Sequence, residues 1–239
     1  MRDLPLPNTE DCAPVVSLLG DTALMLQWRG AADSFAERMI PNVVQAIREL
    51  QLPCVEDVVP GFESVTICFE PRKCSVKALM ETVCRVVNGC QLQQQRVARE
   101  LTIPVRFSSA DSPDLLDVAA SAGMSVPDCI ALLASVRFRV RMIGFAPGFP
   151  YLSGLPECLW LPRLSVPRVS VPAGSFAVAA GQAGIYPRSS PGGWRLLGRT
   201  DVVLFEANGE SPCLLTTGDI VRIEPHGPLF AGYSGDCGT

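Results

Sequence analysis

The chain has 239 residues, of which 48% are hydrophobic and 18% charged, and its formal net charge is −4. This length holds one large domain or two of ordinary size, with ample apolar material for a core. The basic residues form no cluster, which argues against binding to nucleic acid or to an anionic membrane. No apolar run approaches a membrane span, and the first residues lack the hydrophobic region of a signal peptide. We therefore expect a soluble cytoplasmic protein.

Ten cysteines and a single histidine limit the metal and nucleophile chemistry of the chain. No CxxC pair occurs, and one histidine contributes little to a ligand set, so there is no metal-ligand motif. Cys68 and Cys84 lie in apolar patterns typical of small core residues, and we expect reduced, mostly buried thiols. His226 lies in a turn with two prolines, which favours a surface position over a catalytic one.

The first part of the chain alternates pairs of strands with helices. The predicted elements are strands at 15–19 and 22–28, a helix from about residue 34, strands at 55–59 and 64–69, and a helix capped by Ser75. Pro41 interrupts the first helical pattern, so we expect a kink or a shortened helix there. Strand pairs that alternate with helices predict a small α/β sandwich domain.

The polar run Gln91–Arg96 marks a domain boundary, which divides the chain into residues 1–92 and 93–239. In the second domain the predicted elements are a strand at 100–107, helices at 114–122 and 125–135, a strand at 137–143, and short strands at 202–207, 212–216 and 219–224. Many short strands with turn signals predict a barrel or sandwich. The fold class is therefore α+β.

Residues 143–200 form a stretch in which glycine and proline are too dense for a long helix. Aromatic residues and arginines are interleaved through it, whereas a disordered linker is poor in aromatics. We expect a shaped surface of loops and short strands. The repeat LPRLS, VPRVS, VPAGS has a step of five, which does not match the period of a strand, so Arg163 and Arg168 should point in different directions. The alternative is that both are solvated surface arginines.

The chain offers almost no conventional general base. Asp111, Asp114 and Asp117 have the positions of helix-start residues. The sequence GQAG at 181–184 lacks the lysine and the following helix of a phosphate-binding loop. Chemistry at this chain would therefore depend on arginines, backbone donors and hydroxyls, or on a second protein.

The segments GFAPGFPYLSGL, PRLSVPRVSVPAGS, GQAGIYPRSSPGGW and LGRT, in this order and spacing, resemble the carboxyltransferase subdomain C/D family. The resemblance is specific from Gly144 to Thr200 and looser over nearly the whole chain. It implies an N-terminal α/β domain followed by a cyclophilin-like β-barrel. It also implies a 5-oxoprolinase subunit that hydrolyses 5-oxo-L-proline to L-glutamate at the expense of ATP, which is bound by the complex. The implied partners are a carboxyltransferase subdomain A/B subunit and a lactam-utilisation subunit.

A second branch of this family contains Kip-type inhibitors of a histidine kinase, so a non-catalytic regulatory protein is the alternative. Where family members carry Tyr-Gly-Gly-Glu, this chain has Phe107 to Ala110, and where they carry a histidine it has Leu133. A histidine and a glutamate are the groups that one would nominate for proton transfer. Their absence indicates that the chain depends on its partners for catalysis or only binds.

The remaining elements of the resemblance suit binding of a small lactam. The candidate substrate-binding residues are Arg163, Arg168, Gln182, Tyr186, Ser190, Gly192, Gly193, Trp194 and Arg199. Arg163 or Arg168 would hold a carboxylate or phosphate, and Gln182, Tyr186 and Ser190 would orient a lactam or acyl-phosphate group. Backbone amides around the paired glycines would stabilise an oxyanion, and the tryptophan would form a wall with Phe149.

Overall fold

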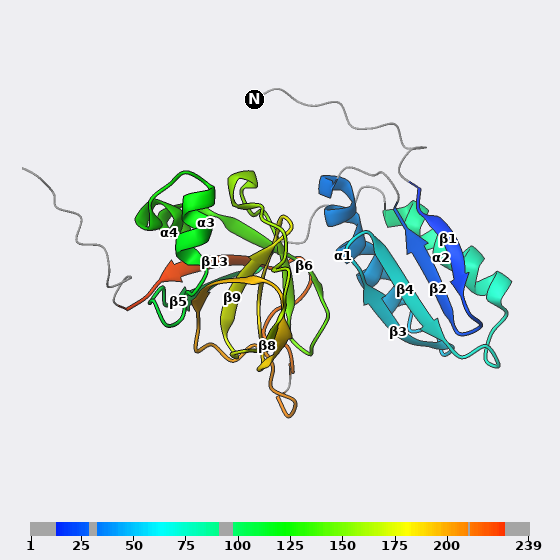
Figure 1. Ribbon diagram of the computed structural model, residues 1–239. Helices are drawn as coiled ribbons and strands as arrows, with labels where there is room; N and C mark the ends of the chain where they lie inside the picture. Colours follow the sequence, from blue (N-terminus) through cyan, green and yellow to red (C-terminus); the bar gives the residue numbers. More distant parts are fainter. Residues whose placement is uncertain (1–12, 29–32, 91–97, 210, 228–239) are drawn as a thin grey trace, which may run out of the picture. The chain divides into compact units, whose positions relative to one another are not determined.

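The computed structural model describes residues 13–28, 33–90, 98–209 and 211–227, without the side chains of 33–38. Contacts divide the chain into two compact units, Met1–Val97 and Ala98–Thr239 (Figure 1). The expected boundary after residue 92 falls in the segment 91–97, outside the described residues. Each unit has a hydrophobic core of its own.

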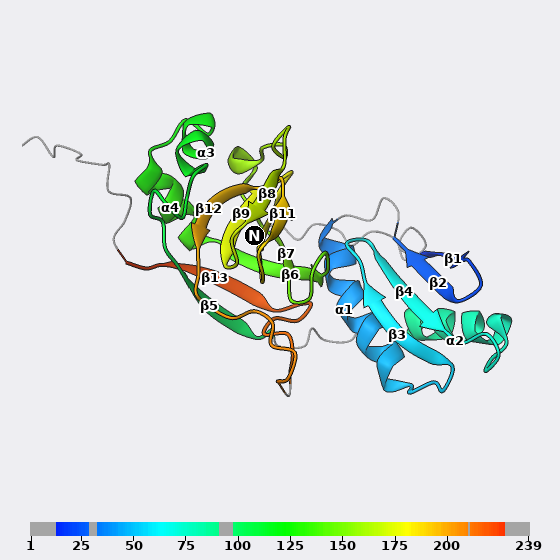
Figure 2. The same ribbon diagram turned by 60° about the horizontal axis from the view of Figure 1, so that its bottom comes forward.

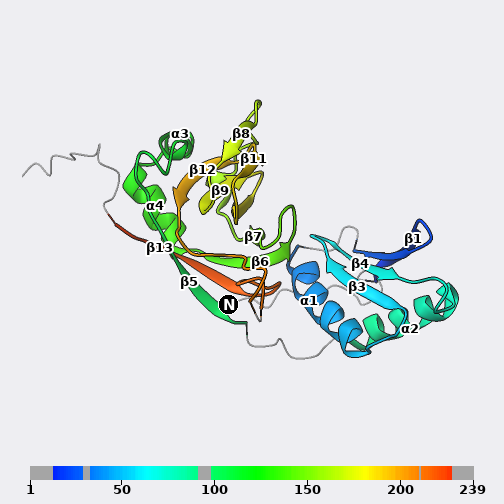
Figure 3. The same ribbon diagram turned by 90° about the horizontal axis from the view of Figure 1, so that it is seen from below.

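The first unit is a four-stranded antiparallel sheet in the order β1-β2-β4-β3, with two helices on one face (Figures 1 and 3). Its elements are β1 (Val15–Leu19), β2 (Ala23–Gln27), α1 (Asp33–Glu49), β3 (Val55–Pro60), β4 (Ser64–Phe69) and α2 (Val76–Gly89). Alternate residues of β4 are buried, because side chains of a strand point to opposite faces and only one face is covered. Val65, Ile67 and Phe69 thus pack against the helices.

The two predicted hairpins and the second helix of this unit are confirmed. The expected shortening of the first helix is wrong, because α1 continues through Pro41 to Glu49. Ile40 and Val43 on either side of the proline are buried in the core, and this packing holds both halves of the helix. Ser75 occupies the N-cap position of α2, but its side chain makes no capping hydrogen bond.

The second unit is built on a seven-stranded sheet in the order β12-β9-β10-β7-β6-β13-β5 (Figure 2). Its strands are β5 (Glu100–Val105), β6 (Arg137–Ile143), β7 (Pro150–Ser153), β9 (Ser175–Ala179), β10 (Gln182–Ile185), β12 (Arg195–Arg199) and β13 (Ile220–Pro225). Neighbours are antiparallel except β13 and β5, which are parallel. An antiparallel bridge between Arg106 and Arg199 joins the two ends of this order, so the sheet nearly closes into a barrel.

Two helices and a short ribbon complete this unit. They are α3 (Leu115–Ser121), α4 (Val126–Ser135) and the antiparallel pair β8 (Arg168–Val171) and β11 (Ser190–Gly192), with a 3₁₀ turn, η2, at Glu157–Leu159. Ser125 caps α4 as predicted, since its Oγ accepts a hydrogen bond from the Asp128 amide at 3.2 Å. Leu115, Cys129 and Leu133 place both helices in the main core.

Strand β9 separates two hydrophobic clusters, because it is buried along its whole length. Phe176 and Val178 belong to the main core, whereas Ala177 and Ala179 point to the opposite face and into a smaller cluster. This alternation follows from the period of two along a strand. The smaller cluster contains the aromatic residues of the glycine- and proline-rich stretch.

Other expectations have mixed outcomes. The prediction of strands at 202–207 and 212–216 is wrong: a single bridge, between Phe205 and Cys213, forms there. The eight described cysteines are all free thiols, but only Cys54 and Cys129 are buried, so the expectation of mostly buried thiols is wrong. His226 is exposed, as expected.

No single helix of the described ranges is long and apolar enough to cross a membrane. Helices α3 and α4 have the length and apolar composition of a membrane span only when they are taken together, and they are bent by 89° at their junction. Their apolar residues, such as Val118 and Ile130, are buried in the core of the second unit.

Candidate binding site on the second unit

Five aromatic side chains gather on the face of the sheet opposite the main core: Phe145, Phe149, Tyr151, Tyr186 and Trp194. We call this set the aromatic face. The ring centroid of Phe149 lies 5.0–5.6 Å from those of Tyr151, Tyr186 and Trp194, and the rings meet edge to face. Such contacts fix the ring orientations as well as bury area. Phe145 lies against Phe149 at 5.3 Å and remains 61% exposed.

The aromatic face lies close to the sheet because the residues beneath it are small. Gly184 pairs with Tyr151 in the sheet, and a Cβ at Gly184 would lie 2.7 Å from Phe149 Cζ. Ala177 and Ala179 supply only methyl groups on the same face. Glycine is thus required at this position by the close approach of a ring to the backbone.

The ribbon β8–β11 contributes polar groups beside the aromatic face. Ser190 pairs with Val171, which is buried in the same cluster, so the two side chains point to the same side. The Ser190 hydroxyl is buried and has no hydrogen-bond partner among the described residues. Gly192 packs directly on the Tyr186 hydroxyl, where any Cβ would overlap it.

Gln182, Gly184 and Tyr186 alternate along one face of β10 and its continuation. The Tyr186 side chain is only 2% exposed. Burial raises the pKa of its hydroxyl, with a smaller contribution from Tyr151, while the positive charges of Arg163 and Arg168 oppose the shift. Tyr186 therefore stays protonated at neutral pH and can donate a hydrogen bond.

The two arginines of the repeat differ in exposure. Arg163 is exposed, and Arg168 is half-buried. Arg168 Nη2 donates to Asp114 Oδ1 at 2.7 Å, and its Nη1 donates to the Trp194 carbonyl at 3.3 Å. Arg168 is therefore the arginine that hydrogen bonds fix beside the aromatic face, while the charge of the exposed Arg163 also acts on Tyr186.

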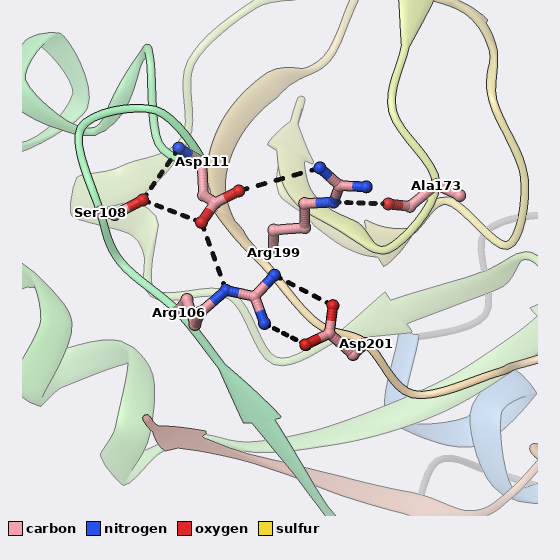
Figure 4. A network of polar contacts seen from close by, with 6 residues as sticks. All are labelled: Arg106, Ser108, Asp111, Ala173, Arg199 and Asp201. Carbon is pink, nitrogen blue, oxygen red and sulfur yellow. Dashed lines mark hydrogen bonds and ion pairs between the residues drawn. The ribbon is translucent and has the colours of Figure 1, made fainter. Parts of the chain in front are cut away.

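Arg199 lies in a separate group at the point where the barrel closes (Figure 4). We call Arg106, Ser108, Asp111, Arg199 and Asp201 the closure network. Asp111 Oδ2 accepts hydrogen bonds from Ser108 Oγ at 2.8 Å and from Arg106 Nε at 3.4 Å, and its Oδ1 lies 4.0 Å from Arg199 Nη1. Arg106 also pairs with Asp201 through both terminal nitrogens, Nη2 at 3.0 Å.

Arg199 Nε donates at 2.9 Å to the carbonyl of Ala173. Gly193 has another backbone role, since its carbonyl accepts a hydrogen bond from the Leu164 amide at 2.7 Å. The fold thus brings Arg168, Tyr186, Ser190, Gly192 and Trp194 together. Arg199 and Gly193 instead hold segments of the second unit in place.

Sequence reasoning misses the two aspartates that face these arginines. The sequence places Asp111 and Asp114 at the start of a helix, but Asp114 makes no capping bond and turns its carboxylate to Arg168 and to the Leu196 amide. A signal is present: from Cys158 to Thr200 the chain has five arginines and no aspartate or glutamate. Counter-charges for a buried arginine in this stretch have to come from elsewhere in the sequence.

The two positions that depart from the family pattern carry no titratable group to the aromatic face. Leu133 is fully buried in the main core, and Ala110 is exposed in the turn before α3. The neighbouring carboxylate of Asp111 is engaged in the closure network. Among the described residues, no three His, Cys, Asp or Glu side chains lie close enough together to hold a metal ion.

A small α/β unit followed by a nearly closed barrel with a covering ribbon defines a two-unit α+β protein of the carboxyltransferase-domain type. The chain belongs to the family described as carboxyltransferase domain, subdomain C and D, which matches residues 14–215. The expected fold class, α+β with a barrel-like second domain, is confirmed.

Two curated relatives match over nearly their full length. The chain is 36% identical over 208 residues to the B subunit of 5-oxoprolinase from Escherichia coli O157:H7, and the match covers 87% of this chain and 94% of the relative. It is 32% identical over 221 residues to the protein of the same name from Bacillus subtilis (strain 168), covering 87% and 90%.

Solved structures share the fold. TTHA0988 superposes with a TM-score of 0.74 at 37% identity, over 86% of this chain and 40% of that longer chain. The urea carboxylase of Kluyveromyces lactis has a TM-score of 0.73 at 21% identity, over 93% of this chain and 23% of the other, and shows the fold alone.

Proposed function

We propose that the chain is a subunit of an ATP-dependent 5-oxoprolinase complex and that its aromatic face binds the lactam 5-oxo-L-proline. The names and near full-length coverage of the curated relatives support the assignment to this complex. The site itself supports the substrate class. The proposed partners are a carboxyltransferase subdomain A/B subunit and a lactam-utilisation subunit.

The observation that carries this proposal is the set of polar groups around the aromatic face. 5-Oxo-L-proline is a small five-membered lactam ring that contains an amide and carries a carboxylate. Aromatic rings fit the ring, the Arg168 guanidinium fits the carboxylate, and the side chain of Gln182 fits the amide. The Ser190 hydroxyl on this side of the ribbon is buried without a partner among the described residues, so a ligand group that reached it would satisfy it. The exposed ring of Phe145 extends the wall toward solvent.

The chain contributes binding and orientation rather than proton transfer. Neither Leu133 nor Ala110 can accept a proton, and burial moves the pKa of Tyr186 still further above neutral pH. General acid–base chemistry requires a group whose pKa lies near the working pH. We therefore assign proton transfer and the use of ATP to groups from the partner subunits. Arg163, which is exposed and whose charge acts on the Tyr186 hydroxyl, is the second candidate for binding an anion.

The test is release of L-glutamate from 5-oxo-L-proline by the co-expressed complex in the presence of ATP, with and without this chain. We expect turnover to require the chain. We expect Arg168→Ala and Gln182→Ala to lower kcat/KM, since each removes a group assigned to the substrate. Arg85→Ala, which changes an exposed arginine of the first unit, is the matched control. Equal turnover by all variants would refute the proposal.

A regulatory protein of the kinase-inhibitor branch is the second candidate. It is favoured by Leu133 and Ala110, which remove the two groups suited to proton transfer. Purification of the tagged chain from its native cells separates the two candidates. Recovery of the two oxoprolinase partners without a kinase supports the first, and recovery of a histidine kinase supports the second.

A further inference from the structure

We infer that Asp114 is a positioning residue of the anion site: it holds the Arg168 guanidinium beside Trp194 and thereby sets the affinity of the site for a carboxylate. This inference rests on the proposed function, in which Arg168 binds the carboxylate of the substrate. It assigns a role to a residue that lies 54 positions from Arg168 in the sequence.

Asp114 is a buried carboxylate, 7% exposed, and both of its oxygens are used. Oδ1 accepts from Arg168 Nη2 at 2.7 Å, and Oδ2 accepts from the Leu196 amide at 2.6 Å. The Asp114 amide in turn donates to the Leu196 carbonyl at 3.1 Å. A carboxylate fixed by its own backbone and by β12 is a rigid support for a guanidinium.

Arg168 needs such a support because the strand that carries it is open to solvent. The next residues of β8, Val169 and Ser170, are exposed, and Val169 is 90% exposed. A long side chain on such a strand loses rotamer entropy when it binds a ligand, and this loss weakens binding. A salt bridge that already orders the side chain removes this loss before the ligand arrives.

The salt bridge with Asp114 leaves part of the Arg168 guanidinium available to bind a carboxylate. Arginine has five N–H donors in one plane. Asp114 accepts one of them and the Trp194 carbonyl another, while the described residues provide no further acceptor. The remaining donors lie in the same plane, so Asp114 also determines where a bound carboxylate must sit.

A purely structural role for Asp114 is the competing explanation, since the residue also anchors the turn before α3 to β12. Asp114→Asn separates the two roles. The amide oxygen can still accept from the Leu196 amide, but the amide nitrogen then faces Arg168 with a donor instead of an acceptor. The turn keeps its hydrogen bond to β12, and Arg168 loses its orientation.

The experiment compares the co-expressed complex carrying Asp114→Asn, Arg168→Ala or both changes. For Asp114→Asn we expect KM for 5-oxo-L-proline to rise about tenfold with kcat changed less than about twofold. The double variant should have a KM no higher than Arg168→Ala alone, because Asp114 acts through Arg168. Asp117→Asn, the same chemical change at an exposed position of α3, should leave KM unchanged.

A second readout does not depend on turnover. Phenylglyoxal modifies arginines, and peptide mapping gives separate rates for Arg168 and for exposed Arg163. Asp114→Asn should accelerate modification of Arg168 several-fold and leave the rate at Arg163 unchanged. An unchanged Arg168 rate, or KM effects that multiply in the double variant, overturns the inference. A wild-type complex without turnover refutes the proposed function, and the modification rates then still decide whether Asp114 holds Arg168.

Discussion

Arg106 and Arg199 exchange two backbone hydrogen bonds, with N–O distances of 2.7 and 2.9 Å, across the gap between the first and last strands of the sheet order. This pairing leaves two arginine side chains next to each other, and like charges opposite each other destabilise a strand pair. Asp111 lies between the two guanidinium groups and accepts from Arg106 (Figure 4). The closure network therefore supplies the negative charge that allows two arginines to face each other where the barrel closes.

Asp111→Asn tests whether this negative charge stabilises the closed barrel. The change removes the negative charge shared by Arg106 and Arg199, and it weakens the hydrogen bond from Ser108. We expect the free energy of unfolding to fall by about 1–2 kcal/mol. Urea unfolding followed by circular dichroism measures this change. Asp201→Asn is the matched control, since this carboxylate pairs with Arg106 but is 79% exposed and should matter less. Equal losses for both variants would contradict the argument.

Gly174 is a second point at which the closed fold depends on one residue. Its φ is +80°, and a Cβ there would overlap the carbonyl oxygen of Thr200, which follows β12. We expect Gly174→Ala to lower the free energy of unfolding by at least about 3 kcal/mol.

Gly123→Ala is the matched control for this effect. Gly123 has nearly the same backbone angle, φ +67°, but nothing lies within 4 Å of the position that a Cβ would take there. The only cost is then the strain of an alanine whose backbone lies in the left-handed region, and we expect the free energy of unfolding to fall by about 1 kcal/mol. Thermal unfolding of both variants separates steric overlap from backbone strain, and a loss at Gly174 no larger than at Gly123 would exclude the overlap.

The local elements can be predicted from the sequence because their causes are local. The strand at Arg137–Ile143 and the Ser125 cap follow from alternation and from one capping side chain, and both are present. The expected shortening at Pro41 is wrong because packing on both sides of the proline outweighs one lost hydrogen bond. The strands expected at 202–207 and 212–216 do not form because apolar residues there pack individually, as Leu204 and Leu215 do in the main core.

The site is predictable as a set of residue types but not as an arrangement. A sequence motif identifies Tyr186 and Trp194, and the structure brings them together with Phe149. The pairing of Asp114 with Arg168 and of Arg106 with Arg199 joins residues far apart in sequence. Such pairs are set by how the sheet closes, and no single segment contains that information.

The buried thiol of Cys129 predicts how stability changes in alkaline solution. Burial raises its pKa to about 11, with a smaller contribution from Cys158, whereas a thiol in an unfolded chain has a pKa of about 8.5. Between these values the folded state keeps a proton that the unfolded state has lost. Stability is therefore fully retained below about pH 8.5 and falls as the pH rises toward about 11.

Urea unfolding at pH 8 and at pH 10 measures this loss. We expect Cys129→Ala to lose less stability between the two pH values than the wild-type chain, because the titrating group is gone. Its stability at pH 8 should be lower, since Cys129 is fully buried in the main core. Cys213→Ala removes a half-buried thiol of the same unit and controls for the loss of a cysteine as such. Identical pH dependence for the wild type and Cys129→Ala would contradict the assignment.

The Ser190→Ala variant shows whether the Ser190 hydroxyl serves ligand binding or the stability of the fold. Its buried hydroxyl has no partner among the described residues, so Ser190→Ala removes an unsatisfied polar group and should leave the free energy of unfolding within about 0.5 kcal/mol or raise it. If the hydroxyl orients the substrate, kcat/KM of the complex should fall at least about fivefold in the same variant. Ser189→Ala is the control, because the exposed Ser189 hydroxyl already has a partner in Ser170 at 2.9 Å and should affect neither quantity. A loss of stability without a loss of activity at Ser190 would mean that the hydroxyl serves the fold and would remove it from the binding site.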